Sequence, residues 1–371
     1  MNSLTDITPF LAADILHVSI AATVKIVAFV FMTILPMVAL SVWAERRVSA
    51  AIQDRVGPNR VGPFGLLQPV ADGIKFLLKE DFTPNHVRKG YYWLAPALTM
   101  VPALLTCAVL PFGSKLFGEK MVIADLNVGP LFVFAIASLT VYGIVLAGWS
   151  SNSKYPFLGG VRATSQMISY EICLGLSIIP VIMIYGELNL GSIVQYQAEN
   201  GWAILPLWGE GLSVKGFLLW IPIIISFIIF TTSMFAETNR LPFDLPECET
   251  ELVAGYHTEY SSMKFALFFL GEYAAMIIGS GLAVTLFLGG WSLPFGWLTP
   301  ESAAADVPWW HGVIHILTFF AKVIGFILFF IVIRWTLPRF RYDQLMRLGW
   351  VFFFEIALIN VILTAVILWI A

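Results

Sequence analysis

Eight long apolar stretches constrain the fold of this chain more than any other feature of its sequence. A helix that crosses a membrane needs about 20 mostly apolar residues. Eight stretches meet this length, and no long polar domain separates them. They lie near residues 18–45, 91–112, 128–150, 165–187, 214–237, 263–290, 313–336 and 347–370. The sequence therefore predicts an all-α integral membrane protein, a single polytopic domain over 1–371 with about eight transmembrane helices.

Composition supports a membrane protein and limits the chemistry that the chain carries by itself. Only 12% of the residues are charged, against about 25% in soluble proteins, and the net charge of −3 argues against nucleic-acid binding. Cys107, Cys173 and Cys248 form no CxxC pair, and His311 and His315 lack the glutamate of an HExxH motif. We therefore expect no metal, flavin or iron–sulfur cluster on this chain, so that any redox chemistry comes from a partner.

The basic residues of the loops predict how the helices are oriented, because Lys and Arg gather in cytoplasmic loops. On one side of the predicted spans the loops contain Arg46, Arg47, Arg55, Arg60, Lys75, Lys79, Arg88, Lys89, Lys154, Arg162, Arg240, Arg339 and Arg341. The other side has Lys115, Lys120 and Lys215. We expect loops 46–90 and 239–262 to face the cytoplasm, with both termini on the outer (periplasmic) side.

Within the first basic loop, residues 64–80 have the pattern of an amphipathic helix. The apolar positions at helical spacing are Leu67, Val70, Ile74, Leu77 and Leu78. The opposite face has Gln68, Asp72, Lys75 and Lys79. A helix of this length and polarity is too short to cross the bilayer, but it can lie in the membrane plane. Lipid contact and packing under a partner protein are both compatible with the pattern.

Several ionisable residues fall inside the predicted spans, where each is a functional candidate by default. Glu171 and Glu272 lie in the fourth and sixth spans, and Glu355 lies in the last. At about 1.5 Å per residue, these glutamates are roughly 9–14 Å from the cytoplasmic boundary. Lys25 and Lys322 lie in the outer halves of the first and seventh spans. The alternative is structural: a static buried ion pair, or a lysine that reaches the membrane surface.

The loop between the fifth and sixth spans, AETNRLPFDLPECETELVAGYHTEY, is strongly acidic. Its carboxylates are Glu237, Asp244, Glu247, Glu249, Glu251 and Glu259, against Arg240 alone. Like charges at this density raise one another's pKa and can pass protons along. A solvated acidic loop is the alternative, but the interleaved leucines and phenylalanines favour a loop that packs against something. Together with the intramembrane glutamates, the loop indicates a proton or ion path.

Four segments resemble a known family. They are AERRVSAAIQDRVGPNRVGPFGLLQPVADGIKFLLKED at 44–81, AETNRLPFDLPECETELVAGYHTEYSSMKFALFFLGEY at 236–273, QMISYE at 166–171 and LPRFRYDQLM at 337–346. They are similar to the H-subunit family of proton-pumping NADH:quinone oxidoreductase (respiratory complex I), whose mitochondrial counterpart is NADH dehydrogenase subunit 1. The eight predicted helices agree with this family.

The resemblance implies a translocase subunit that binds a quinone, ubiquinone or menaquinone, where the membrane arm meets the peripheral arm. NADH oxidation, FMN and the iron–sulfur chain would belong to other subunits. The expected partners are the peripheral-arm quinone-site subunits, neighbouring small membrane subunits and lipid, in a bacterial inner membrane. The quinone would enter between the first helix, the sixth helix and the segment 64–80.

The resemblance also assigns roles to residues. Coupling of quinone reduction to proton pumping is implied for Glu171, Glu237, Asp244, Glu247, Glu249, Glu251, Glu259 and Glu272. The quinone chamber and its entry are implied for Arg46, Phe64, Leu67, Arg240 and Phe243. No role is assigned to Lys25, Lys322, Arg334 or Glu355. The last helix departs from the family pattern, because Trp350 is followed by Val351 and Glu355 stands where the family has a proline.

Two other functions are weighed against this one. A related subunit of a membrane-bound hydrogenase would share the helices but would match the 44–81 and 236–273 segments more loosely. A cation/proton antiporter would show duplicated halves or broken helices, and the sequence has no visible internal repeat.

The charge bias of the loops makes a testable prediction about topology. Single cysteines introduced at Asn2 and at Asn59 should react with a membrane-impermeant maleimide from opposite faces of the membrane, because Asn59 lies in a basic loop and Asn2 precedes the first span. Labelling of both positions from the same face would contradict the eight-helix topology.

Overall fold

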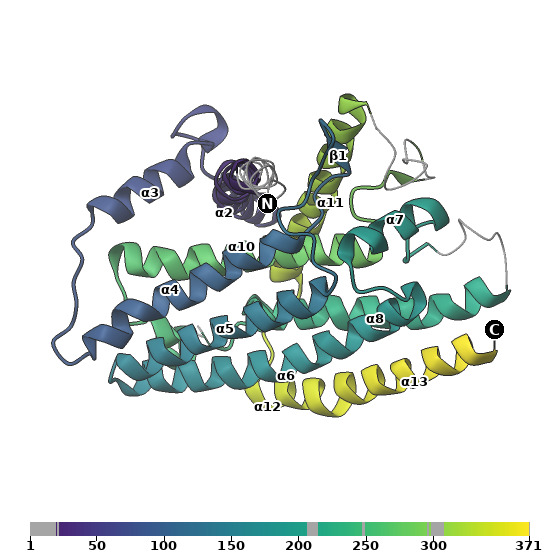
Figure 1. Cartoon of the computed structure of the whole chain (residues 1–371). Helices are drawn as coiled ribbons and strands as arrows, with labels where there is room; N and C mark the ends of the chain where they lie inside the picture. The colour runs from purple at the N-terminus through teal and green to yellow at the C-terminus, as the bar shows by residue number, and fades with distance from the viewer. Residues whose placement is uncertain are drawn as a thin grey trace, which may run out of the picture.

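Long helices make up nearly all of the computed structural model of this chain (Figure 1). The structure describes residues 22–205, 214–246, 249–294 and 308–370, with Ile20 and Trp297. Within these ranges, 8 helices are long and apolar enough to cross a membrane. They are η1 Val27–Ile34 continued by α2 Leu35–Ile52, α4 Lys89–Leu105 continued by the 3₁₀ turn η3 Thr106–Val109, α5 Gly129–Ser150, α6 Lys154–Tyr185, α8 Val214–Glu237, α10 Ser262–Phe287, α11 Trp309–Thr336, and α12 Tyr342–Arg347 continued by η6 Leu348–Phe353 and α13 Phe354–Ile370. The predicted helical class is correct.

Some helices extend further than hydropathy predicted. The first span continues to Ile52 rather than ending near 45, and α6 begins at Lys154 rather than near 165. These extensions contain polar residues, which lower the local hydropathy without interrupting the helical hydrogen bonds. The connections hold the short elements α3 Gln68–Leu78, α7 Leu190–Asn200, α9 Glu249–Leu252, the 3₁₀ turns η2 Pro63–Gly65 and η4 Gly255–His257, and an antiparallel hairpin of β1 Lys115–Leu116 and β2 Glu119–Lys120.

Helix α10 is the most enclosed of these helices. In its most apolar window 72% of the residues are buried, against 22% in the first span and 17% in the last. Small residues on α10 and on its neighbours allow close approach, as is usual for packed membrane helices. At the contact between α4 and α5, for example, a Cβ added at Gly143 would lie 2.4 Å from Thr99 Oγ1. The buried residues of α10 form a nearly continuous run over 271–287.

Buried polar side chains form hydrogen bonds that fix the relative positions of neighbouring elements. Gln166 on α6 donates from Nε2 to the carbonyl oxygens of Ala236 and Phe243, each at 2.8 Å, and so holds the loop that follows α8. Asn360 on α13 donates to Ser226 Oγ on α8 at 3.0 Å. A buried amide left without such partners would cost about 1–3 kcal/mol. The acidic loop is thus tied to the helices, as its apolar content predicted.

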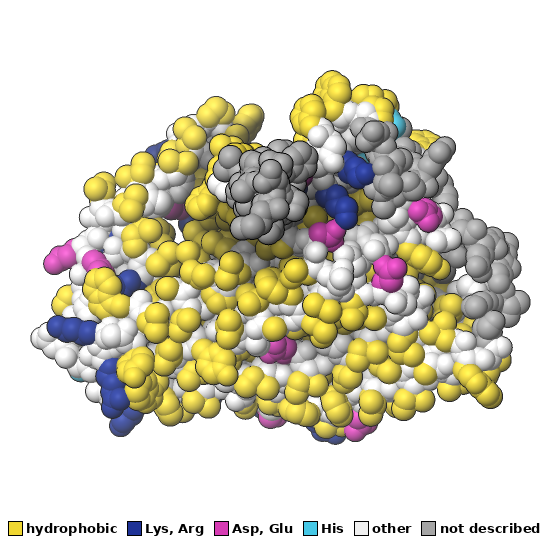
Figure 2. Space-filling view, in the orientation of Figure 1, with side chains coloured by type: hydrophobic (Ala, Val, Ile, Leu, Met, Phe, Trp, Pro, Cys, Tyr) yellow, Lys and Arg dark blue, Asp and Glu magenta, His cyan; other side chains and the backbone are white. Residues whose placement is uncertain are grey.

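The first span and α3 stand apart from the main bundle. Figure 1 shows α2 nearly end-on while α4, α6 and α13 run across the view, so the first span is strongly inclined to them. Helix α3 packs against α2 and α10 and has no buried residue. Its apolar row is open to the surroundings, with Val70 at 56% and Leu77 at 68% exposure. Figure 2 shows hydrophobic side chains over most of this face, with charged ones mainly toward the two ends.

Candidate functional site

A buried arginine is the centre of the candidate site. Arg240 follows α8, and its Nη1 lies 3.8 Å from Glu45 Oε2 on α2. Its Nη2 lies 3.9 Å from Glu272 Oε2 on α10. The side chains of Arg240, Glu45 and Glu272 are only 13%, 14% and 10% exposed. Charges this far from water are stable only when counter-charges or hydrogen bonds accompany them, so the three side chains depend on one another.

More side chains complete this ionic network. Arg334 near the end of α11 forms an ion pair with Glu45 Oε1. The Tyr273 hydroxyl donates to Glu45 Oε2, and the Arg240 guanidinium lies 4.1 Å over the Tyr273 ring. We call Glu45, Arg240, Glu272, Tyr273 and Arg334 the Arg240 network. It joins α2, the loop after α8, α10 and α11 at one end of the bundle.

The loop places two titratable groups beside this network. Burial raises the pKa of Asp244 to about 7; its partner Arg339, at 3.2 Å, opposes this shift, and the nearby Glu272 adds to it. Burial lowers the pKa of His257 to about 4, so its imidazole is neutral at pH 7. Tyr256, whose ring contacts that of His257, donates its hydroxyl to Glu272 Oε1 at 2.7 Å.

A small cavity extends from Glu272 between the helices. Its volume is about 70 Å³, and its lining includes Glu272 of α10 and Glu237 at the end of α8. Hydroxyl groups also line it, from Thr99, Thr106, Thr140 and Thr238. One water needs about 10–15 Å³ of such space and a few polar partners, so the cavity has room for several waters. Glu171 on α6 is close enough to Glu237 for their charges to interact.

Two further carboxylates of the loop, Glu251 and Glu259, form ion pairs outside the network. Glu251 pairs with Arg162 on the surface, at 2.6 Å. Glu259 lies 3.8 Å from His86 Nε2. Glu247 falls outside the described residues, and so does the side chain of Glu249. The sequence therefore grouped carboxylates that the fold separates into a buried set and a surface set.

The residues predicted at the quinone entry lie around α2 and α3. Arg46 Nη1 contacts Asp72 Oδ2 of α3 at 2.7 Å. Phe64 and Leu67 are 67% and 52% exposed, next to the start of α3. Phe243, in contrast, is 4% exposed. It lies among packed rings, with Phe340 at 5.5 Å and Tyr170 at 5.7 Å between centroids.

The structure also places the residues to which no role was assigned. Arg334 belongs to the Arg240 network. Lys25 pairs with Glu119 at 2.9 Å. The Lys322 ammonium donates to the carbonyl oxygens of residues 288, 290 and 292 at 2.7–2.9 Å, which favours a structural role for it. Glu355 lies on the exposed surface of α13.

The start of α10 holds the far end of α3. The Ser262 hydroxyl donates to the carbonyl oxygens of Phe76 and Lys79, at 2.9 and 3.0 Å. The Lys264 ammonium, whose side chain is 9% exposed, lies 3.0 Å from Asp81 Oδ1 and 2.9 Å from Thr83 Oγ1. We call these contacts the α3 clasp. It fixes α3 to the same helix that carries Glu272.

Sequence reasoning missed three members of the site. Glu45 falls at the end of an apolar run, although AERR places a carboxylate beside the basic residues that begin the loop. Tyr256 and Tyr273 occur in the segments around the carboxylates and drew no role of their own, yet their hydroxyls serve Glu272 and Glu45. The sequence offered one signal for these tyrosines, their positions relative to Glu272. Tyr273 follows it directly, and Tyr256 precedes it by 16 residues.

These observations define a multi-pass helical membrane protein with a buried ionic network at one end. The sequence model of the NADH dehydrogenase family matches residues 24–365. The chain therefore belongs to the NADH dehydrogenase family, which confirms the resemblance drawn from its motifs.

Three relatives match nearly the whole chain, and each is an H-type subunit of an NADH-quinone oxidoreductase. The chain is 49% identical over 346 residues to the first H-type protein of Geobacter metallireducens, covering 92% of this chain and 95% of the relative. It is 46% identical over 345 residues to the first H-type protein of Cytophaga hutchinsonii, covering 91% and 94%. The relative from Rhodospirillum rubrum is 48% identical over 335 residues, covering 90% of each chain. The relatives are thus parts of an oxidoreductase complex, rather than of a hydrogenase or an antiporter.

The pairing of Glu45 with two arginines yields a prediction. Glu45→Gln leaves Arg240 and Arg334 without their shared anion. Breaking a buried pair costs about 3–5 kcal/mol; because Arg334 is 32% exposed, we expect a smaller loss, about 1–3 kcal/mol. The measurement is the temperature at which this chain leaves the purified complex.

The double variant Glu45→Gln, Arg334→Gln removes one of the stranded cations and should be more stable than Glu45→Gln alone. Glu80→Gln, an exposed position, serves as the matched control and should leave the temperature unchanged. A double variant that loses as much as the sum of the two single variants would show that Glu45 and Arg334 are not coupled.

Proposed function

We propose that this chain forms part of the quinone-binding chamber and its lateral entry in an NADH:quinone oxidoreductase, and that it couples quinone reduction to proton translocation. The observation that carries the proposal is the position of Arg240 between Glu45 and Glu272. One cation there serves two carboxylates on different helices. A change of charge near it alters the electrostatic environment of both.

The coupling step follows from Coulomb's law. Unit charges about 4 Å apart interact by about 4 kcal/mol at an effective dielectric constant of ~20. Arg240 Nη2 lies at this distance from Glu272. A negative charge that develops on a reduced quinone beside Arg240 competes with Glu272 for the guanidinium, which weakens the ion pair between Arg240 and Glu272.

The proposed proton path continues into the bundle. Glu272 and Glu237 line the same cavity, together with threonine hydroxyls. Glu171 interacts electrostatically with Glu237. Waters in such a cavity can relay protons between carboxylates, because each makes two to four hydrogen bonds. The proposed direction is from the Arg240 network toward Glu237 and Glu171, and from there to neighbouring membrane subunits.

The proposed quinone entry lies between α2, α3 and α10. These helices pack together, and the exposed row of α3 offers an apolar surface to an isoprenoid tail. Phe64 and Leu67 lie at the mouth, and Arg46 fixes α3 through Asp72. The α3 clasp holds the other end of the same helix. The width of the entry then depends on both attachments.

The remaining parts of the proposal concern the setting. The quinone is ubiquinone or menaquinone, and no metal, flavin or iron–sulfur cluster is assigned to this chain. Its partners are other complex I subunits, chiefly those of the peripheral arm at the quinone site, and membrane lipid. We place it in a bacterial inner membrane with the Arg240 network toward the cytoplasm, since the basic loops lie at that end.

The substitution Glu272→Gln tests whether Glu272 couples quinone reduction to proton translocation. It keeps the size of the side chain and the hydrogen bond from Tyr256 but removes the ionisable carboxyl group. NADH:quinone turnover and proton translocation should fall together, by about tenfold or more, because a positioned proton-transfer group contributes about 10²–10⁴-fold. NADH oxidation by ferricyanide, which takes place in other subunits, should be unchanged. Glu80→Gln is the control.

A Glu272→Gln complex that assembles and pumps at the normal rate would show that Glu272 is only structural. Loss of ferricyanide activity as well would indicate failed assembly. In that case the milder Glu272→Asp, which retains a titratable group, decides the question: it should assemble and recover part of both coupled activities.

Variants of the α3 clasp test the proposed quinone entry. Lys264→Met removes the contacts with Asp81 and Thr83 and loosens α3, so the KM for a long-chain quinone should rise by about threefold to tenfold, the size expected for one partly buried ion pair. Lys264→Arg should restore most of the affinity, and Lys89→Met, at an exposed position outside the clasp, should have no effect. An unchanged KM in an intact Lys264→Met complex would contradict the proposed entry.

A further inference from the structure

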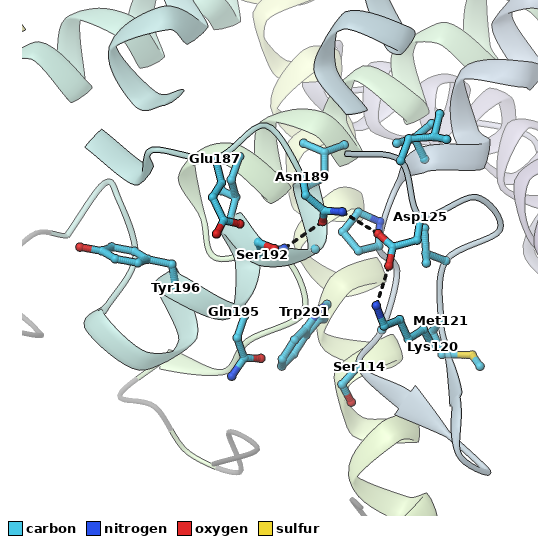
Figure 3. A pocket seen from close by; sticks show the side chains of 18 of the residues that line it. Ser114, Lys120, Met121, Asp125, Glu187, Asn189, Ser192, Gln195, Tyr196 and Trp291 are labelled. Carbon is cyan, nitrogen blue, oxygen red and sulfur yellow. Dashed lines mark hydrogen bonds and ion pairs between the residues drawn. The ribbon is translucent and has the colours of Figure 1, made fainter. Parts of the chain in front are cut away.

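A second, larger cavity lies at the end of the bundle opposite the Arg240 network. Its volume is about 380 Å³, within the range of small-molecule sites. It is bounded by the ends of the spans Lys89–Val109 and Lys154–Tyr185, by α7, and by the β1–β2 hairpin. Figure 3 shows the lining side chains, which come from segments far apart in the sequence. Nothing in the proposed quinone and proton chemistry uses this cavity.

The two walls of the cavity carry opposite charges. The hairpin side contributes Lys115 and Lys120, and the α7 side contributes Glu187 and Glu199. Figure 3 places Lys120 and Asp125 on one side and Glu187 on the other. In Figure 2, basic and acidic side chains gather around this part of the surface, above the apolar helices. A ligand with a single charge would meet an opposite charge on only one of the two walls.

Part of the charge is already satisfied within the protein. Asp125 accepts from the Lys120 ammonium at 2.6 Å and from the Asn189 amide at 2.7 Å. The hydrogen bond from Lys120 holds the pKa of Asp125 below its usual range. Asp125 is thus a fixed element of the wall. Lys115 on one side and Glu187 on the other also line the cavity, together with Glu199, which accepts from the Gln195 amide at 2.7 Å.

The height of the cavity along the helices indicates the kind of ligand. Val109 and Tyr185, which line it, are the last residues of their spans, so it lies at the ends of these apolar helices. The start of α5 packs against the lining residue Leu190 through Gly129, and its neighbours Val128 and Leu131 are 47% and 58% exposed. A molecule with a polar head in the cavity could therefore lay an apolar chain on α5.

The aromatic lining favours an ammonium at the acidic wall. Tyr185 and Tyr196 both line the cavity and lie 5.1 Å apart between ring centroids, edge to face. Aromatic faces attract cations, and Glu187, two residues after Tyr185, adds a carboxylate to the same lining. On the opposite wall, the Lys115 ammonium suits a phosphodiester as a point charge.

We propose that this cavity binds the headgroup of a zwitterionic phospholipid with a primary ammonium, of the phosphatidylethanolamine class. The phosphodiester faces Lys115, the ammonium faces Glu187 and Glu199, and the acyl chains follow α5. The proposal is independent of the quinone chemistry, since the cavity and the Arg240 network lie at opposite ends of the spans.

Photolabelling of the purified complex tests this site. The probe is a phosphatidylethanolamine with a diazirine near the glycerol end of one acyl chain, and mass spectrometry locates the labelled peptides. We expect label within 109–131 and 185–199. Excess unlabelled phosphatidylethanolamine should compete, and the same excess of phosphatidylglycerol should compete far less. The Glu187→Gln, Glu199→Gln variant should lower the labelling about fivefold, as expected for two partly exposed charge contacts.

Matched variants and competitors decide among the outcomes. Asn200→Ala, on α7 but outside the lining, should keep full labelling, whereas Lys115→Ala should reduce it. Equal competition by phosphatidylglycerol would overturn the zwitterion assignment. Strong competition by soluble glycerophosphoethanolamine would show that the occupant is not a lipid. Absence of label from both peptides would overturn the site itself.

Discussion

The Arg240 guanidinium lies between the carboxylates of Glu45 and Glu272, in a part of the protein that water scarcely reaches. Arginine does not lose its charge in such surroundings, so both acids must be in place for the loop after α8 to adopt this position. Arg334 is bound to one of these acids, Glu45. The relative placement of α2, α10 and α11 at this end follows from these pairings, and the placement of α3 follows from α2 and α10.

The two ends of the bundle use charge in different ways. At the Arg240 end, cations and anions are in contact and buried, so a change in one is felt by the others through a medium of low dielectric constant. At the opposite end, the charges stand on separate walls of an open cavity, where water screens them. The first arrangement suits transmission of an electrostatic signal, and the second suits recognition of a molecule that enters from outside.

Much of the fold could be predicted from the sequence because hydropathy and loop charge are local properties. The helices formed where the apolar stretches predicted, and the family motifs identified the correct relatives. The ionic pairs were not accessible in this way. Arg334 had no assigned role until α11 was seen to place it beside Glu45. Asp244 and Glu251 look alike in one acidic loop, yet one is buried against Arg339 and the other meets Arg162 at the surface. Such differences depend on tertiary contacts.

The inclination of the first span couples this protein to the thickness of its membrane. Ala22–Ile52 has 31 residues, about 46 Å at 1.5 Å per residue, whereas the hydrocarbon core is about 30 Å thick. Such a helix fits by tilting, and its tilt increases as the bilayer thins. Glu45 lies toward the Ile52 end of this helix. A helix that tilts carries Glu45 with it, so the ion pairs of Glu45 with Arg240 and Arg334 connect the tilt of the first span to the buried charges.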